Sequence, residues 1–189
     1  HPNSYFNMGN AFQDQGKLEE AIKAYTKAIE LKPDYARAYN NLGFIFHDQG
    51  KLEEAVEAYS KTVSISPDLA YPFHNMGNVF LDQGKIDEAI KAYEKAISVN
   101  PEYAEAYSNM GNALRIQCKF EEAIAAYTKA ILLKPQNADF YYNMGNARKD
   151  QGKLEEAIEA YTQAIGLKPD YAGAYNNLGV IFHDQGKLE

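Results

Sequence analysis

The apolar residues of the chain recur at helical spacing, in segments separated by short polar stretches. In the first segment Tyr5, Met8 and Phe12 lie three and four residues apart. This spacing places their side chains on one face of an α-helix. A polar stretch at residues 14–17 follows, and a second helical pattern resumes at Leu18. The pattern therefore predicts two helices joined by a tight turn.

The predicted helix pair recurs every 34 residues along the chain. The interval separates Pro33, Pro67, Pro101, Pro135 and Pro169, and it also separates Gly9, Gly43, Gly77, Gly111, Gly145 and Gly179. We assign repeats to 2–35, 36–69, 70–103, 104–137 and 138–171, with a partial repeat at 172–189. The pattern predicts an all-α fold of eleven helices with no strand. A short helix pair cannot bury both apolar faces, so the repeats should stack into one solenoid domain over 1–189.

Each repeat carries aromatic, small and proline residues at fixed places. In the first repeat these are Tyr5, Met8, Gly9, Phe12, Ala21, Tyr25, Ala28 and Pro33. They resemble the pattern of the tetratricopeptide repeat (TPR) family over essentially the whole chain. The resemblance implies a right-handed α-solenoid of antiparallel helix pairs. It also implies that the first helix of each repeat lines an inner, concave wall that binds a protein or peptide.

Four residues depart from the repeat pattern: Thr62, Leu114, Cys118 and Arg148. Cys118 replaces the glycine of the turn between two helices, and turns of this kind lie at the surface. We therefore expect a free, accessible thiol. Replacing Cys118 with glycine should stabilise the protein if the backbone has a positive φ here.

Composition limits the classes of function. The formal net charge is -7, which disfavours a nucleic-acid partner because phosphate binding needs clustered Lys and Arg. No apolar run approaches the roughly 20 residues that cross a bilayer, so we expect no membrane segment and an intracellular, cytoplasmic location. A single cysteine, isolated histidines and no phosphate loop give no catalytic, metal or cofactor site. The sequence predicts a protein that is not an enzyme.

Charge is unevenly distributed between the two helices of each repeat. Only 11 of the 45 charged residues lie in the first-helix segments 2–15, 36–49, 70–83, 104–117, 138–151 and 172–185. The second helices and turns form a solvated surface of mixed charge. An aspartate recurs near the end of most first helices, and we expect it to pair with the lysine of the following turn, as Asp14 would with Lys17.

Asparagine is enriched on the first helices, in two rows. The first row consists of Asn7, Asn41, Asn75, Asn109, Asn143 and Asn177, and the second of Asn10, Asn78, Asn112 and Asn146. An amide side chain can pair with both the N–H and the C=O of an extended peptide. The first row is similar to the asparagine ladder in the repeats of protein O-linked N-acetylglucosamine transferase, which implies binding to a peptide backbone. The alternative is that the asparagines join neighbouring helices, and for the second row we favour ligand contact.

The predicted ligand is an extended peptide whose backbone contacts Asn75, Asn109 and Asn143. Aromatic and histidine side chains between the asparagines should form pockets for its side chains; these are Phe44, Tyr71, His74 and Tyr142. Among the inner positions compared with a carboxylate-binding repeat domain, only Arg37 is positively charged, which disfavours capture of a C-terminal carboxylate.

Two other functions stay open from the sequence. The chain starts without a methionine and stops within a repeated motif, which predicts a fragment of a longer protein. It would then be a targeting domain cut from an enzyme such as a glycosyltransferase. The second alternative is head-to-tail self-association through the last helix, where Tyr175, Leu178 and Phe182 should form an exposed apolar face.

Overall fold

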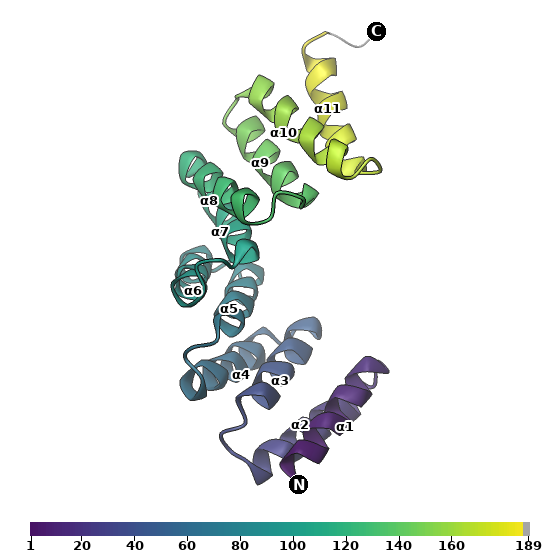
Figure 1. Cartoon of the computed structure of the whole chain (residues 1–189), viewed down its shortest axis with the longest axis vertical. Coiled ribbons are helices and arrows are strands. Elements are labelled where there is room, and N and C mark those ends of the chain that lie inside the picture. The colour runs from purple at the N-terminus through teal and green to yellow at the C-terminus, as the bar shows by residue number, and fades with distance from the viewer. Residues whose placement is uncertain (187–189) are drawn as a thin grey trace. The chain divides into compact units, whose positions relative to one another are not determined.

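The structure is a computed structural model that describes residues 1–186 (Figure 1). These residues form eleven α-helices and no strand, so the predicted all-α fold of antiparallel helix pairs is confirmed. The helices are α1 (Pro2–Asp14), α2 (Leu18–Leu31), α3 (Ala36–Asp48), α4 (Leu52–Ile65), α5 (Ala70–Asp82), α6 (Ile86–Val99), α7 (Ala104–Ile116), α8 (Phe120–Leu133), α9 (Ala138–Asp150), α10 (Leu154–Leu167) and α11 (Ala172–Asp184). None of the described helices is long and apolar enough to span a membrane.

The turn within each pair is closed by backbone hydrogen bonds around a residue with positive φ. In the first repeat Gly16 has φ 71°, and its N–H donates to the carbonyl of Gln13 at 2.9 Å. The N–H of Lys17 donates to the carbonyl of Phe12, also at 2.9 Å. These two bonds satisfy carbonyl groups left open at the end of α1, and glycine adopts this conformation without a steric penalty. The tight turn returns the chain along α1 as α2.

Cys118 occupies the same turn position between α7 and α8. Its φ is 59°, and its N–H donates to the Arg115 carbonyl at 2.9 Å, as in the glycine turns. The side chain is exposed and the thiol is free, which confirms the prediction for this residue. The hydrogen bonds of the turn therefore hold a non-glycine residue in the left-handed region.

Replacing Cys118 with glycine should raise the free energy of unfolding by up to about 1 kcal/mol. The left-handed conformation costs a residue with a Cβ roughly 1–2 kcal/mol, and the greater freedom of glycine in the unfolded chain offsets part of that gain. Urea unfolding measures the change. The matched control is Cys118→Ala, which removes the thiol but keeps the Cβ. Equal stability of the two variants would contradict a strained turn.

Within each pair a glycine of the first helix lies against a tyrosine of the second. Tyr25 is fully buried, and a Cβ built on Gly9 would lie only 2.5 Å from its ring. The fully buried Ala21 and Ala28 flank the tyrosine along the same face of α2. Small residues on both helices thus create the space that the ring fills.

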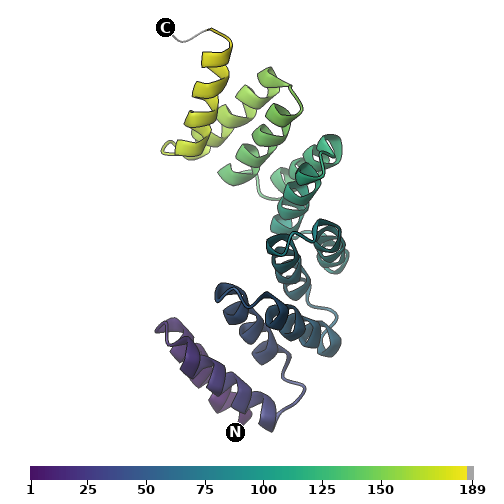
Figure 2. The ribbon, with the colours of Figure 1, turned by 180° about the vertical axis from the view of Figure 1, so that it is seen from behind.

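The pairs pack on one another within two compact units. The first unit, His1–Asn100, contains α1 to α6, and the second begins at Pro101 and contains α7 to α11. Within a unit the second helix of one repeat packs against the first helix of the next, as α2 does on α3 and α10 on α11 (Figure 2). Core side chains such as Tyr25, Leu42 and Ile45 join successive repeats in one cluster. The first helices of adjacent repeats, α3 and α5 or α7 and α9, also touch.

Candidate functional site

The second asparagine row bonds to the buried tyrosines. In each of four repeats the tyrosine hydroxyl donates to the Oδ1 atom of the asparagine on the first helix of the same repeat. The pairs are Tyr25 with Asn10 at 2.8 Å, Tyr93 with Asn78 at 2.7 Å, Tyr127 with Asn112 at 2.7 Å, and Tyr161 with Asn146 at 2.8 Å. The carbonyl of each amide is thereby used inside the repeat, and the orientation of the amide is fixed.

Asn41 and Asn177 of the first row bond to an asparagine and a tyrosine of the preceding repeat. The Nδ2 atom of Asn41 donates to Asn10 Oδ1 at 3.0 Å and to the Tyr25 hydroxyl at 3.1 Å. Asn177 makes the two equivalent contacts to the repeat before its own, at 2.9 Å to Asn146 Oδ1 and 3.2 Å to the Tyr161 hydroxyl. These amides therefore brace neighbouring repeats, which is the alternative left open by the sequence.

The remaining asparagines of the first row have varied surroundings. Asn75 Oδ1 lies 3.3 Å from Nδ1 of His74, and Asn143 Nδ2 lies 3.4 Å from Oγ of Ser108. Asn109 is half-buried, and Asn7 is exposed. The row is thus uniform in sequence but not in its bonding.

The four side chains predicted to form pockets differ in exposure. Phe44 on α3 is 52% exposed. His74 is almost buried and lies against the ring of Tyr93, with 5.8 Å between centroids. Tyr71 and Tyr142 are half-buried, and the ring of Tyr142 packs on Tyr161 and Tyr171. Of the four, Phe44 therefore presents the largest exposed fraction of an apolar side chain.

Several charged side chains on the first helices are already paired with protein groups. The guanidinium of Arg37, the only Lys or Arg on α1, α3 and α5, lies 5.1 Å from the centre of the Phe6 ring. Asp82 binds Nε2 of His47 at 2.6 Å. Asp150 is held by Arg115 in the same way. The expected pairing with turn lysines is wrong for these two aspartates, because each reaches the first helix of the preceding repeat.

Burial changes the acidity of the central tyrosines. It raises the pKa of Tyr59, Tyr93, Tyr127 and Tyr161, because the phenolate cannot be hydrated inside the helix stack. The pKa of Tyr25 is raised for the same reason. These hydroxyls therefore stay protonated and do not serve as bases at neutral pH.

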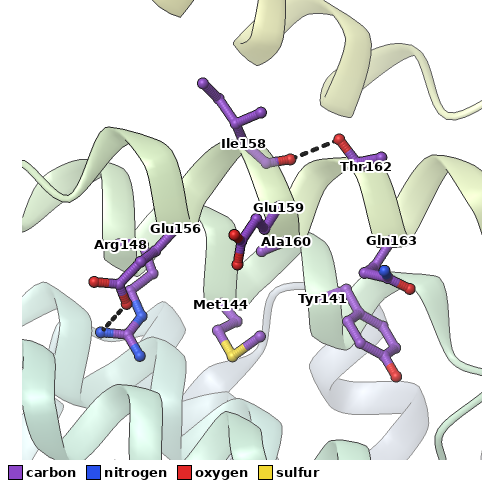
Figure 3. A pocket seen from close by; sticks show the side chains of 9 residues that line it. All are labelled: Tyr141, Met144, Arg148, Glu156, Ile158, Glu159, Ala160, Thr162 and Gln163. Atoms are coloured by element: carbon purple, nitrogen blue, oxygen red, sulfur yellow. Dashed lines mark hydrogen bonds and ion pairs between the residues drawn. The ribbon is translucent and has the colours of Figure 1, made fainter.

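A pocket between α9 and α10 was not predicted from the sequence. It has a volume of about 410 Å³, and an ion pair between Arg148 and Glu156, 2.8 Å long, closes one end (Figure 3). Its lining consists of Tyr141, Met144, Arg148, Glu156, Ile158, Glu159, Ala160, Thr162 and Gln163. Arg148 stands where four repeats, the partial one included, have phenylalanine, and this departure was the available signal. No asparagine of the two rows lines the pocket.

The described residues contain no group of three or more His, Cys, Asp or Glu side chains arranged to hold a metal ion. A family model for the TPR repeat matches residues 9–50, 45–84, 77–117, 111–152 and 145–186. The chain belongs to the TPR repeat family. This match confirms the resemblance to the family seen in the sequence.

Solved structures of other TPR proteins have the same fold. MamA protein, known from a crystal structure, is 27% identical in sequence to this chain. The two structures match with a TM-score of 0.80 over 90% of this chain and 93% of MamA. YrrB, described as a TPR protein with an unusual peptide-binding site, is 25% identical with a TM-score of 0.77, covering 93% and 90%. MamA from Desulfovibrio magneticus RS-1 is 20% identical with a TM-score of 0.81, covering 90% and 97%, and shows likeness of fold alone. No curated protein sequence matches the chain.

The family and these structural neighbours support a function as a protein-interaction scaffold. TPR scaffolds are generally non-catalytic.

Proposed function

We propose that this TPR chain binds an extended peptide segment of a partner protein on the face of its first helices that carries the asparagines. The observation that carries the proposal is the bonding of the second row. Asn10, Asn112 and Asn146 each accept a hydrogen bond from a tyrosine, while their Nδ2 groups donate to no other side chain among residues 1–186. Each amide therefore offers a fixed donor to a ligand.

Fixed donors suit the recognition of a peptide backbone. A flexible asparagine would lose side-chain entropy on binding, whereas an amide held by tyrosine has already lost it. Backbone carbonyl groups recur along any extended peptide, so donors that recur from repeat to repeat recognise its main chain rather than its sequence. The braces made by Asn41 and Asn177 also hold Asn10 and Asn146 in place.

Other residues of the first row complete the proposed surface. Asn75 Oδ1 lies 3.3 Å from His74 Nδ1 and Asn143 Nδ2 lies 3.4 Å from Ser108 Oγ, and a ligand amide can replace these two long contacts. Asn109 lies at the same register on α7 and is assigned the same role. Because the first helices carry few charges, binding should depend little on salt.

Replacing both Asn112 and Asn146 with aspartate tests the proposal. Aspartate keeps an oxygen that accepts the tyrosine hydrogen bond but removes the amide donors. With about 0.5–1.5 kcal/mol for each lost bond, affinity should fall roughly 5- to 150-fold. The probe is a set of linear peptides selected on the wild-type chain from a phage-displayed library, with dissociation constants measured by calorimetry.

The matched control removes the tyrosine hydroxyls and keeps the amide donors. Tyr127→Phe with Tyr161→Phe should lower the unfolding midpoint and weaken binding less than the aspartate variant does, because the amide donors remain but are no longer held in place. If the aspartate variant binds as tightly as wild type, the asparagine face is not the binding site. The peptides would then have to bind elsewhere, for example in the pocket beside Arg148.

A further inference from the structure

The second repeat lacks the asparagine that pairs with the central tyrosine in the other full repeats. Phe44 stands at that register on α3, and the tyrosine of the repeat is Tyr59. Tyr59 is fully buried, and its hydroxyl has no acceptor for its proton among the described residues. The side chain of Asn75 approaches it closely enough to oppose the rise in its pKa. A phenylalanine at position 44 thus leaves a buried donor unpaired, which destabilises the repeat.

Phe44 does not recover that loss by packing in the core. Its neighbours Leu42 and Ile45 are buried in the cluster that joins the first two repeats, and Phe46 packs at its edge. Phe44 itself is 52% exposed and lies outside this cluster. The fold of the isolated chain therefore gives no reason for an aromatic residue at this register.

The surroundings of Phe44 belong to the proposed peptide-binding face. Asn40, Asn41 and Arg37 lie one and two turns before it on the same side of α3. The side-chain oxygens Asn40 Oδ1 and Gln49 Oε1 of this repeat are also buried without a partner among residues 1–186, and Gln49 shares this property with equivalent glutamines such as Gln83 and Gln151. The adjacent helix α5 contributes Tyr71, which interacts with Arg37.

Building on the proposed function, we infer that Phe44 determines specificity on this face by receiving an apolar side chain of the bound peptide. The asparagines recognise the main chain of the peptide and so accept many peptide sequences. Phe44 adds an aromatic ring to this face. Only an apolar peptide side chain, such as leucine, isoleucine, methionine or phenylalanine, covers the ring well. Arg37 already lies over the Phe6 ring, so the ring of Phe44 and not this cation is the open group of the second repeat.

Replacing Phe44 with asparagine separates binding from folding. The new amide supplies the acceptor that Tyr59 lacks, so F44N should unfold at a higher urea concentration than wild type. It should also bind the library-selected linear peptides about tenfold to a hundredfold more weakly. Selection of the same library on F44N should yield peptides without the apolar residue that wild type enriches.

Two control variants isolate the cause. Tyr59→Phe removes the unpaired hydroxyl and keeps Phe44, so it should bind the selected peptides like wild type. Leu132→Asn removes a more exposed apolar side chain, 72% exposed on the second helix α8, and should leave affinity unchanged. A loss of affinity in either control would show that the effect of F44N is not specific to the ring.

The outcomes distinguish this inference from the proposed function. If F44N binds and selects peptides like wild type while the Asn112 and Asn146 double variant binds weakly, the inference is wrong and the proposed function stands. If neither variant loses affinity, both are wrong. A less stable F44N would show that Phe44 serves the fold, and would also overturn the inference. If wild type selects no linear peptide, the proposed function fails and the inference fails with it.

Discussion

Raising the pH above 10 should unfold this protein steeply. The tyrosines Tyr59, Tyr93, Tyr127 and Tyr161 have an ordinary pKa of 10.0 in the unfolded chain, and burial raises the pKa of each in the folded state. Above pH 10 the unfolded chain releases protons that the folded chain retains. The unfolded state then binds fewer protons, so stability falls as the pH rises.

The expected slope is large because the repeats multiply the effect. Each tyrosine that ionises only on unfolding lowers the free energy of unfolding by about 1.4 kcal/mol per pH unit, so four lower it by roughly 5 kcal/mol per unit. Urea midpoints between about pH 8 and pH 12 measure the slope, with far-ultraviolet circular dichroism for helix and absorbance for tyrosinate. Tyr93→Phe should reduce the slope by about one tyrosine's share.

The circular dichroism signal for helix and the absorbance of tyrosinate should change together. Tyrosinate from the four buried rings should appear only as helix is lost. If all tyrosines ionise while the chain stays helical, the central rings are hydrated and the packing described here is wrong.

Replacing Gly77 with alanine should destabilise the protein by about 1–3 kcal/mol or more. The new Cβ would lie 2.5 Å from the ring of Tyr93, which is fully buried and has no room to move. Either α5 and α6 separate or the tyrosine leaves its position and its bond to Asn78. Chemical unfolding monitored by circular dichroism gives the change in free energy.

Gly179 provides a matched control at the same register. A Cβ built there meets nothing within 4 Å, so Gly179→Ala should leave stability unchanged or raise it by up to about 1 kcal/mol through helix propensity. A Gly77→Ala variant as stable as Gly179→Ala would show that the two helices of a pair do not need close contact.

The sequence was sufficient to predict the helices and their pairing. Glycine in the turns, proline after the second helix and apolar residues at helical spacing recur five times, and each acts locally on the backbone. Cys118 was predicted correctly for the same reason, because a turn position dictates exposure and φ whichever residue occupies it.

The sequence was not sufficient to predict the bonding of the asparagines. An amide donates and accepts, so its spacing alone does not say whether it faces a ligand, a tyrosine of its own repeat or a neighbouring asparagine. The partner of Asp82 was missed because His47 is 35 residues away and reaches it only when repeats stack. A comparison of the repeats could have predicted the unpaired Tyr59 hydroxyl, since Phe44 replaces the asparagine that accepts the hydrogen bond in the other full repeats.

The braces span a short distance in the sequence, which allows the number of repeats in this protein to change during evolution. Asn41 reaches back 31 residues to Asn10, and Asn177 reaches back 31 residues to Asn146, so each brace joins only neighbouring repeats. A duplication or excision of one whole 34-residue repeat restores the same partners at the new junction, whereas a shorter deletion separates them. Unequal recombination between repeats can therefore lengthen or shorten the binding surface without redesigning its interior.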